Sequence, residues 1–461
     1  MIDHENTTPA PSSEGSSVIH KDDAIAVVYQ SGFGNTFESE SVRGALPLGR
    51  NNPRKVPFDL YAEQLSGTAF TRPRHLNQRT WLYRKQPSAA MNTRAFECKG
   101  FFGGADPEKG ILDPNALRWM PFTEENSKDD DPKDFVSGTH LLGSSGDPAQ
   151  KSGLAIYVYL CQNSMCTEDG NSYFCNSDGD LLILPQQGIL EIRTEMGILS
   201  VNPGEFCVVP RGVVHSVNLV KSDDSADDST IFRGYMLEVF KGHLVLPELG
   251  PIGSNGLANA RDFLYPTAWT EQTSSETSEI RTLYNKFGSK LWSRYIDMSP
   301  LNVVAWHGNY LPYKYDLAKF CAVNTVTYDH LDPSVYTVMT CVGDETGTAL
   351  CDFVIFPPRW MSTDSNTFRP PWFHRNCMTE FMGLIWGGYD AKKAFLPGGA
   401  SLHSCMTPHG PDAATYDKAV ADPCEQPVYF SSGLAFMFET TCMLRLTEYA
   451  LTHRHDGSKK A

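Results

Sequence analysis

The stretch Gly204-Glu-Phe-Cys-Val-Val-Pro210-Arg-Gly212-Val-Val-His215 says most about the fold of this chain. A short apolar run leads into a Pro-x-Gly turn, and a histidine comes after two further residues. Proline fixes φ, and glycine supplies turn conformations that other residues resist. The stretch therefore predicts a strand that ends in a tight turn and then re-enters a β-barrel.

The sequence on either side repeats this alternation of short apolar runs and turn signals. SGLAIYVYLC (152–161), LLILP (181–185) and GILEIRTEMG (188–197) each predict a strand, and NSDGD (176–180) predicts a turn between strands. The chain also contains 37 Gly and 30 Pro, a load that weakens helix interiors. The pattern favours a β-sandwich or barrel over a helical bundle.

The spacing of Gly204, Pro210, Gly212 and His215 resembles the second sequence motif of the cupin family. In cupins that bind a metal, the preceding hairpin supplies a His-x-His pair and a glutamate. Here that hairpin reads NSDGDLLILPQQGILEI (176–192) and contains no histidine. We therefore expect this barrel to bind no metal, and we interpret His215 as a core or surface histidine.

The length of 461 residues favours two domains. We predict a mainly β protein with two cupin-like or jelly-roll-like domains joined by a short helical linker. Residues 1–23, which are rich in Ser, Thr, Pro and acidic residues, are expected to form a disordered tail. The N-terminal domain is predicted to span 24–270, the linker 271–300 and the C-terminal domain 301–461.

The helix in the linker is predicted from apolar side chains at helical spacing. These are Ile280, Leu283, Tyr284 and Phe287.

The net charge of −15 makes nucleic acid an unfavourable partner. An anionic substrate would need a locally positive pocket. Two acidic stretches, 123–134 and 221–230, are expected to be solvated loops.

The 12 cysteines contain no CxxC pair. The N-terminus has no apolar segment of the kind found in a secretory signal, and the sequence has no apolar run long enough to span a membrane. We therefore expect reduced cysteines and a cytoplasmic protein with no membrane partner.

The residues best suited to chemistry lie between His330 and His409. His374 and Glu380 are six residues apart in FRPPWFHRNCMTE, and His409 lies in TPHGPD. Two histidines and one carboxylate form the facial triad of iron(II) oxygenases, which leaves coordination positions open for substrate and O2. A zinc hydrolase can use the same ligands, and a straight strand would separate His374 from Glu380 by about 20 Å. The spacing therefore permits these residues to share a metal ion, but it does not prove such a site or distinguish iron from zinc.

Several long strings resemble the homogentisate 1,2-dioxygenase family from about Tyr29 to Leu451. They include NNPRKVPFDLYAEQLSGTAFT (51–71), ELGPIGSNGLANARDF (248–263), TFRPPWFHRNCMTEFMGLI (367–385) and LPGGASLHSCMTPHGPD (396–412). The resemblance implies a two-barrel chain with iron(II) in the C-terminal domain. It also implies ring opening of homogentisate by O2 to maleylacetoacetate in tyrosine and phenylalanine breakdown, and a homohexamer built from two trimers.

The resemblance also implies roles for individual residues. His374, Glu380 and His409 fall on the iron ligands, and His330 of DHLDPS falls on the catalytic acid/base. Substrate contacts are implied for Tyr389, His409 and, as a further pocket histidine, His403. In LIWGGYDAK (384–392) this chain departs from the family pattern at Trp386 and Gly388, which we expect to affect substrate preference.

Asp412 and Asn376 are candidates for orienting the ligands, and turn formation is the alternative role for both.

Two other functions of the protein also stay open. One is a different cupin enzyme, such as a metal-dependent isomerase or a dioxygenase for gentisate. The other is a non-catalytic bicupin, such as a storage or sugar-binding protein.

Overall fold

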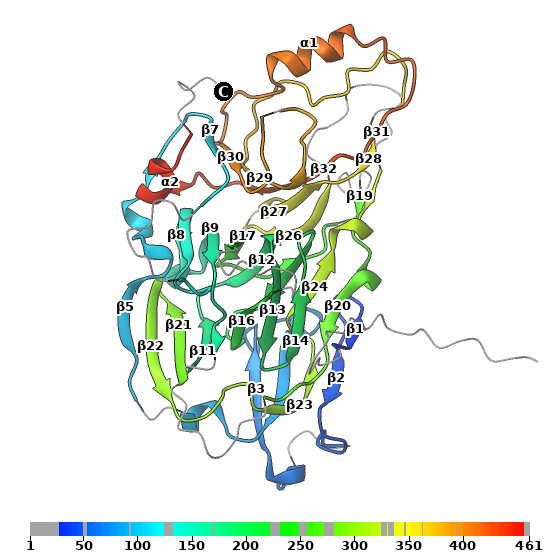
Figure 1. Ribbon diagram of the computed structural model, residues 1–461. Coiled ribbons are helices and arrows are strands. Elements are labelled where there is room, and N and C mark those ends of the chain that lie inside the picture. The colour runs from blue at the N-terminus through cyan, green and yellow to red at the C-terminus, as the bar shows by residue number, and fades with distance from the viewer. Residues whose placement is uncertain are drawn as a thin grey trace, which may run out of the picture.

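Antiparallel sheets dominate the computed structural model of this protein (Figure 1), as the mainly β prediction requires. The structure describes residues 27–48, 53–91, 94–123, 132–167, 170–221, 231–248, 256–271, 281–323, 330, 336–344, 347–361, 363–392 and 394–455. The predicted tail 1–23 and most of the two acidic stretches lie outside these residues. The NSDGD turn is found where it was predicted, between β11 (Gly170–Asn176) and β12 (Asp180–Gln187).

The N-terminal half is built mainly on two large sheets. The first contains, in spatial order, β1 (Tyr29–Ser31), β20 (Phe263–Pro266), β24 (Tyr313–Asp316), β15 (Glu205–Val209), β12 (Asp180–Gln187), β17 (Phe232–Val239), β9 (Ser152–Cys161), β8 (Thr139–Asp147), β33 (Arg445–Leu446) and β6 (Ile111–Leu112). The second contains β14 (Gly197–Val201), β13 (Ile189–Thr194), β16 (His215–Val220), β11 (Gly170–Asn176), β21 (Arg281–Phe287), β22 (Lys290–Ile296) and β5 (Glu97–Phe101), with β10 (Cys166–Thr167) beside β11.

A smaller four-stranded sheet extends this half at the lower end of Figure 1. It consists of β2 (Phe37–Glu40), β23 (Val303–Gly308), β4 (Arg79–Arg84) and β3 (Tyr61–Ser66).

The C-terminal half carries one seven-stranded sheet at the upper end of Figure 1. Its order is β18 (Leu244–Val245), β26 (Thr337–Val342), β27 (Ala349–Phe356), β32 (Gly433–Thr440), β29 (Thr379–Gly387), β30 (Ala400–His403) and β7 (Leu117–Trp119). Two short pairs complete the strands: β19 (Gly256–Leu257) with β25 (Cys321–Ala322), and β28 (Arg359–Trp360) with β31 (Tyr429–Phe430). The α-helices are α1 (Ala413–Ala421) and α2 (Glu448–Thr452), and no helix in the described residues is long and apolar enough to cross a membrane.

The two halves exchange short strands. β7 of the N-terminal half pairs with β30, and β33 of the C-terminal half pairs with β8 and β6. β23 and β24 lie beyond the predicted boundary at residue 301, yet they pair with strands of the N-terminal half. By strand pairing, therefore, the change from one half to the other comes after Asp316.

The predicted helix in the linker is wrong. Its described part forms a hairpin of β21 and β22, with Gly288 (φ 62°) and Ser289 (φ 61°) at the turn. Two consecutive residues with positive φ make the tight turn that joins antiparallel strands. β21 also pairs in parallel with β11, so sheet pairing overrides the helical spacing of its apolar residues.

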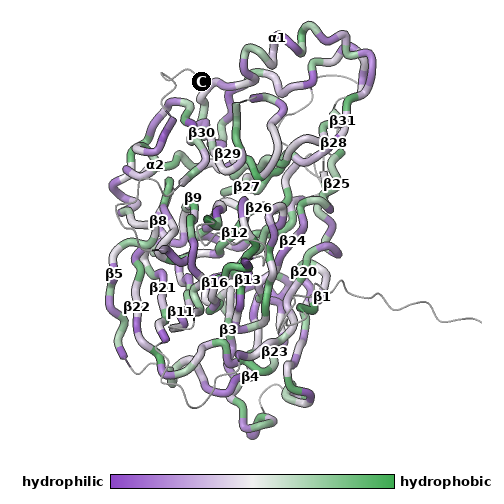
Figure 2. Tube along the Cα trace, in the orientation of Figure 1, coloured by the Kyte–Doolittle hydropathy of each residue, from purple (hydrophilic) through white to green (hydrophobic). Residues whose placement is uncertain are grey.

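One continuous hydrophobic core joins the two halves. Phe206 of β15 meets Phe353 of β27 edge to face, with ring centroids 5.1 Å apart. Tyr235 of β17 packs against Phe436 of β32 at 4.7 Å. Figure 2 shows hydrophobic and hydrophilic positions alternating along many strands, the pattern that gives a sheet one buried face. This shared core holds β29 and its neighbours in fixed positions.

Candidate metal centre

The C-terminal sheet positions a carboxylate and a histidine on adjacent strands. Glu380 is the second residue of β29, and His403 is the last residue of β30. The two are direct partners in the antiparallel register. Because cross-strand partners project to the same face of a sheet, both side chains face one pocket.

The other two histidines lie on loops that meet beside this edge. The His374 backbone N–H donates to the His409 carbonyl at 2.9 Å, and the His409 N–H donates back at 3.1 Å. This two-residue bridge fixes both loops. The chain then turns between His374 and the start of β29, so a spacing that would extend to about 20 Å in a straight strand folds into direct contact.

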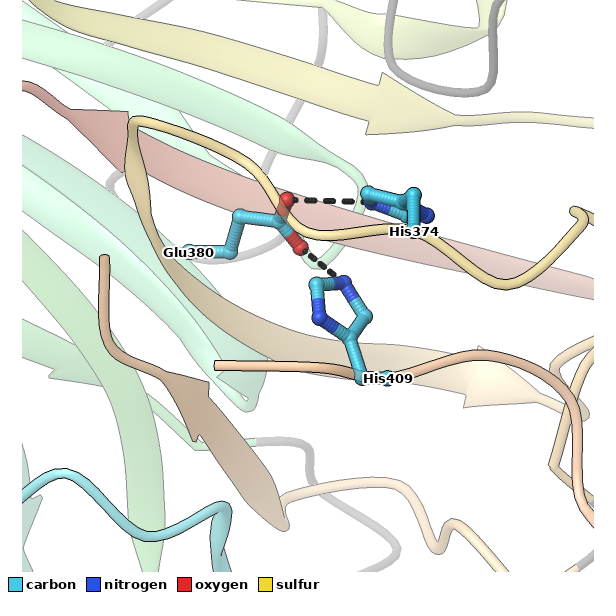
Figure 3. A group of neighbouring side chains, drawn as sticks. All are labelled: His374, Glu380 and His409. Atoms are coloured by element: carbon cyan, nitrogen blue, oxygen red, sulfur yellow. Dashed lines mark hydrogen bonds and ion pairs between the residues drawn. The ribbon is translucent and has the colours of Figure 1, made fainter. Parts of the chain in front are cut away.

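Three of these side chains converge on one point. His409 Nε2 lies 2.8 Å from Glu380 Oε2, and His374 Nε2 lies 3.4 Å from Glu380 Oε1. One ligand atom from each residue lies within 4.8 Å of the others. Figure 3 shows the two imidazoles approaching the carboxylate from different loops. The structure thus brings together the three residues that the sequence suggested as metal ligands.

The hydrogen bonds of the two imidazoles orient their rings. His374 Nδ1 lies 3.2 Å from the Trp372 carbonyl, and His409 Nδ1 lies 2.9 Å from the Thr407 carbonyl. A carbonyl only accepts, so each Nδ1 carries a proton. Each Nε2 faces Glu380 and is the atom through which the ring would bind a metal. Such a partner on the far nitrogen is the usual way that proteins orient a metal-binding histidine. The donor set therefore fits a divalent transition metal.

His403 is arranged differently from the other two histidines. Its Nε2 lies 3.1 Å from the Lys392 ammonium, which can only donate. Nδ1 must then carry the proton, and it points toward Glu380 Oε2 at 3.7 Å. Burial lowers the pKa of His403 to about 4, so the ring is neutral. It stacks on His409 at 3.9 Å and has no free lone pair for a metal.

Glu380 is charged in this setting. Burial raises the pKa of its carboxyl group, but the neighbouring imidazoles of His374, His403 and His409 outweigh burial and hold that pKa well below its usual range. The buried side chain is therefore an anion, which is the form that binds a cation.

Asn376 links two buried carboxyl groups. Its Nδ2 donates to Glu380 Oε1 at 3.0 Å and to Glu439 Oε1 at 2.6 Å, and its own Oδ1 accepts from the Met378 N–H. Of the two candidates for orienting the ligands, Asn376 thus contacts the triad. Asp412 instead caps α1 by accepting from the Thr415 N–H at 2.7 Å.

The three candidate ligands, His403, Tyr389 and Lys392 line one pocket, together with Phe356, Pro371, Met382, Ala391, Gly410 and Met437. The ring of Tyr389 packs edge-on against Phe356 at 5.6 Å. Trp386 and Gly388 are exposed and are not among these residues. Our expectation that they tune substrate preference by lining the pocket is therefore not supported by the described residues.

His330 is not placed beside the triad. It is exposed and lies between residues 324–329 and 331–335, which are outside the described part of the chain. It does not belong to the described pocket wall, so its catalytic role stays a prediction.

Our sequence reasoning missed Lys392 and Glu439. The need of an anionic substrate for a positive pocket was recognised, and Lys392 is the lysine that lines this one. Glu439 is the cross-strand partner of Glu380 on β32. No spacing rule along the chain connects residues 59 positions apart, so only the sheet register reveals that pair.

Comparison with known proteins gives two family matches that together span almost the whole chain. The model of the homogentisate 1,2-dioxygenase N-terminal region matches residues 28–317, and that of the C-terminal region matches 318–459. The division between the models coincides with the change of sheet after Asp316.

Individual relatives agree over similar lengths. A homogentisate 1,2-dioxygenase from Dictyostelium discoideum is 53% identical over 92% of this chain and 93% of its own. The Homo sapiens protein of that name is 49% identical, with 92% of each chain covered. Among solved structures, a cupin 2 conserved barrel protein from Leptotrichia buccalis covers 68% of this chain and 91% of its own, at 8% identity and a TM-score of 0.27. That score is too low to support an argument.

Proposed function

The chain belongs to the homogentisate 1,2-dioxygenase family, and from this we propose how its C-terminal pocket carries out the reaction. The enzyme opens the ring of homogentisate to maleylacetoacetate in tyrosine and phenylalanine catabolism. Both atoms of O2 enter the product, so the equation balances without a further reductant. The observation that supports the proposal most strongly is the convergence of His374, Glu380 and His409 in one pocket.

We assign iron(II) to these three residues. Two neutral imidazoles and one carboxylate suit iron, with coordination positions left for substrate and O2. When bound, iron(II) supplies O2 activation and makes a bound hydroxyl more acidic. Zinc accepts the same donors, and the family membership favours iron.

The pocket wall suits an aromatic carboxylate. Lys392 is the ammonium group on that wall, and His403 Nε2 accepts a hydrogen bond from it at 3.1 Å. We propose that Lys392 binds the acetate group of homogentisate and that His403 positions Lys392. Tyr389 and His409 complete the substrate contacts, with Met382 and Met437 as apolar surface against the ring.

A proton must leave a ring hydroxyl before the electron-rich ring reacts with O2. We assign this proton transfer to His330, because it occupies the acid/base position of the family string DHLDPS. An imidazole can both accept and return a proton, which is what an acid/base residue must do.

We further propose a homohexamer of two trimers in the cytoplasm. The hexamer rests on the family resemblance alone. The compartment is supported by the cysteines, among which the described residues form no disulfide, as expected in a reducing environment.

Oxygen consumption tests the proposed function. Protein purified without air and supplied with iron(II) and ascorbate is expected to consume O2 with homogentisate and much more slowly with gentisate. Mass spectrometry should show a product equal to homogentisate plus O2. Faster turnover of gentisate would point to the related ring-opening enzymes. If the purified protein retained no metal and consumed no O2, the alternative function as a non-catalytic bicupin would be favoured.

A further inference from the structure

A cavity of about 430 Å³ opens on the four-stranded sheet at the far end of the molecule from the candidate metal centre. In Figure 1 its strands β2, β3 and β23 lie at the bottom, and β29 and β30 lie at the top. The cavity is lined by Thr36, Phe70, Arg72, Arg74, Asn77, Arg79, Trp81, His307, Gly308 and Asn309. The proposed dioxygenase chemistry does not use it.

The cavity wall carries a concentrated positive charge. Arg72, Arg74 and Arg79 all contribute to it, and the described lining contains no carboxylate. Within the described residues, no ion pair or hydrogen bond occupies any of the three guanidinium groups. Glu38, the strand partner of His307, is an acidic neighbour of the cavity but does not line it. In a chain with a net charge of −15, such a concentration of unpaired cations is a local exception.

The loop that carries two of the arginines is held in place by its own hydrogen bonds. Asn309 Oδ1 accepts from the Arg79 N–H at 3.0 Å, and its Nδ2 donates to the Asn77 carbonyl at 3.1 Å. Thr68 Oγ1 accepts from the Gln78 N–H at 2.9 Å. The Asn77 side chain also donates, from Nδ2 to the Ala69 carbonyl at 3.3 Å. Both asparagine side chains are therefore used within the protein, and the guanidinium groups are the donors left for a ligand.

Aromatic rings flank the arginines. Phe70 is 77% exposed, which is unusual for a large apolar side chain. Trp81 lies on β4 and His307 on the adjacent β23, and His307 Nε2 is 3.1 Å from the buried Tyr83 hydroxyl. These flat faces can cover an organic ligand or hold a guanidinium in place by stacking.

We propose that this cavity is a binding site for a small oxyanion with two or more negative charges. Each guanidinium offers several N–H donors in a planar fork that matches phosphate and carboxylate oxygens. Three of them around one cavity can hold two such groups at once. A phosphate ester and a dicarboxylate share this chemistry.

Calorimetric titration of the iron-loaded full chain tests the site. Inorganic phosphate and succinate are the two probes, at an ionic strength held constant with chloride. We expect one such anion to bind per chain at this cavity. Arg74→Ala and Arg79→Ala should each weaken binding by about ten-fold or more, and Arg79→Lys, which keeps the charge but loses the fork, should weaken it less. Tighter binding of phosphate would identify the natural ligand as a phosphate ester, and tighter binding of succinate would identify it as a dicarboxylate.

Arg445→Ala removes an exposed arginine on β33 and serves as the matched control, with unchanged binding expected. The rate of homogentisate turnover should be normal in every arginine variant. Anion titration therefore tests the cavity, and oxygen uptake tests the proposed function separately. The site would be refuted by equal binding in wild-type and arginine variants or by absence of binding at constant ionic strength. It would also be refuted if the arginine variants changed the assembly size and left anion affinity intact.

Discussion

At the scale of single residues, the three histidines of the pocket are distinguished by the group that each Nε2 faces. Nε2 of His374 and of His409 faces Glu380, whereas Nε2 of His403 accepts from Lys392. The family resemblance implied iron ligation for His409 and a further pocket role for His403. The hydrogen-bond partners add that His403 is suited to holding a lysine.

Replacing Lys392 with Met should raise KM for homogentisate by about ten-fold, because a charge-assisted contact to the substrate carboxylate is lost. The effect on kcat should be smaller. Burial lowers the pKa of Lys392 to about 8, so its positive charge is present below that pH and lost above it. Wild-type KM should therefore rise above about pH 8, and the variant should show no such rise.

Steady-state oxygen uptake across pH 6 to 9, an interval of about three units around that pKa, checks this. Lys418→Met on the exposed face of α1 is the control and should match wild type. An unchanged KM in Lys392→Met would mean that another group binds the carboxylate.

His330→Ala should slow turnover by about 100-fold or more while iron stays bound, because general acid–base catalysis contributes that much. Iron content and kcat measured on the same sample separate the two effects. Loss of iron from this variant would make His330 a ligand and our assignment wrong.

At the scale of elements, the strands were easier to predict than the connections between them. SGLAIYVYLC corresponds to β9 residue for residue, because a fully buried strand reads as a continuous apolar run. The β21–β22 hairpin was mistaken for a helix, although Gly288-Ser289 is itself a hairpin signal. β21 pairs with β11, a strand about 110 residues earlier in the sequence. The spacing of apolar residues within one segment carries no information about such a distant partner.

The histidine of the cupin-like motif makes β16 sensitive to acid. His215 is 1% exposed, with Nδ1 at 3.1 Å from the Val213 carbonyl, and burial lowers its pKa to about 4. Below an unfolded pKa of about 6.5 the unfolded chain binds the proton first. This neutral histidine therefore costs up to roughly 3 kcal/mol of stability as pH falls from 6.5 to 4.

Urea unfolding at a series of pH values measures this loss. His215→Asn cannot titrate in this range and should lose less stability across it, while the exposed His75→Asn should behave as wild type. Equal slopes in His215→Asn and wild type would show that His215 does not contribute.

At the scale of the whole molecule, the mainly β architecture followed from the composition and from the alternation of short apolar runs with turn signals. The boundary could not be predicted, because β7 and β33 each cross to the sheet of the other half. This exchange of strands depends on pairing between segments that are far apart in the sequence. It also joins the two halves, because β30, which carries His403 of the pocket, pairs with β7 of the N-terminal half.

The most direct test of our central claim is the iron content per chain of protein purified without air. We expect about one iron per wild-type chain, since the triad is a single site, and almost none in Glu380→Ala, which lacks the anionic ligand. Glu439→Gln, its cross-strand neighbour on β32, should keep the metal. A fully loaded, active Glu380→Ala protein would contradict the assignment of His374, Glu380 and His409 as the iron site.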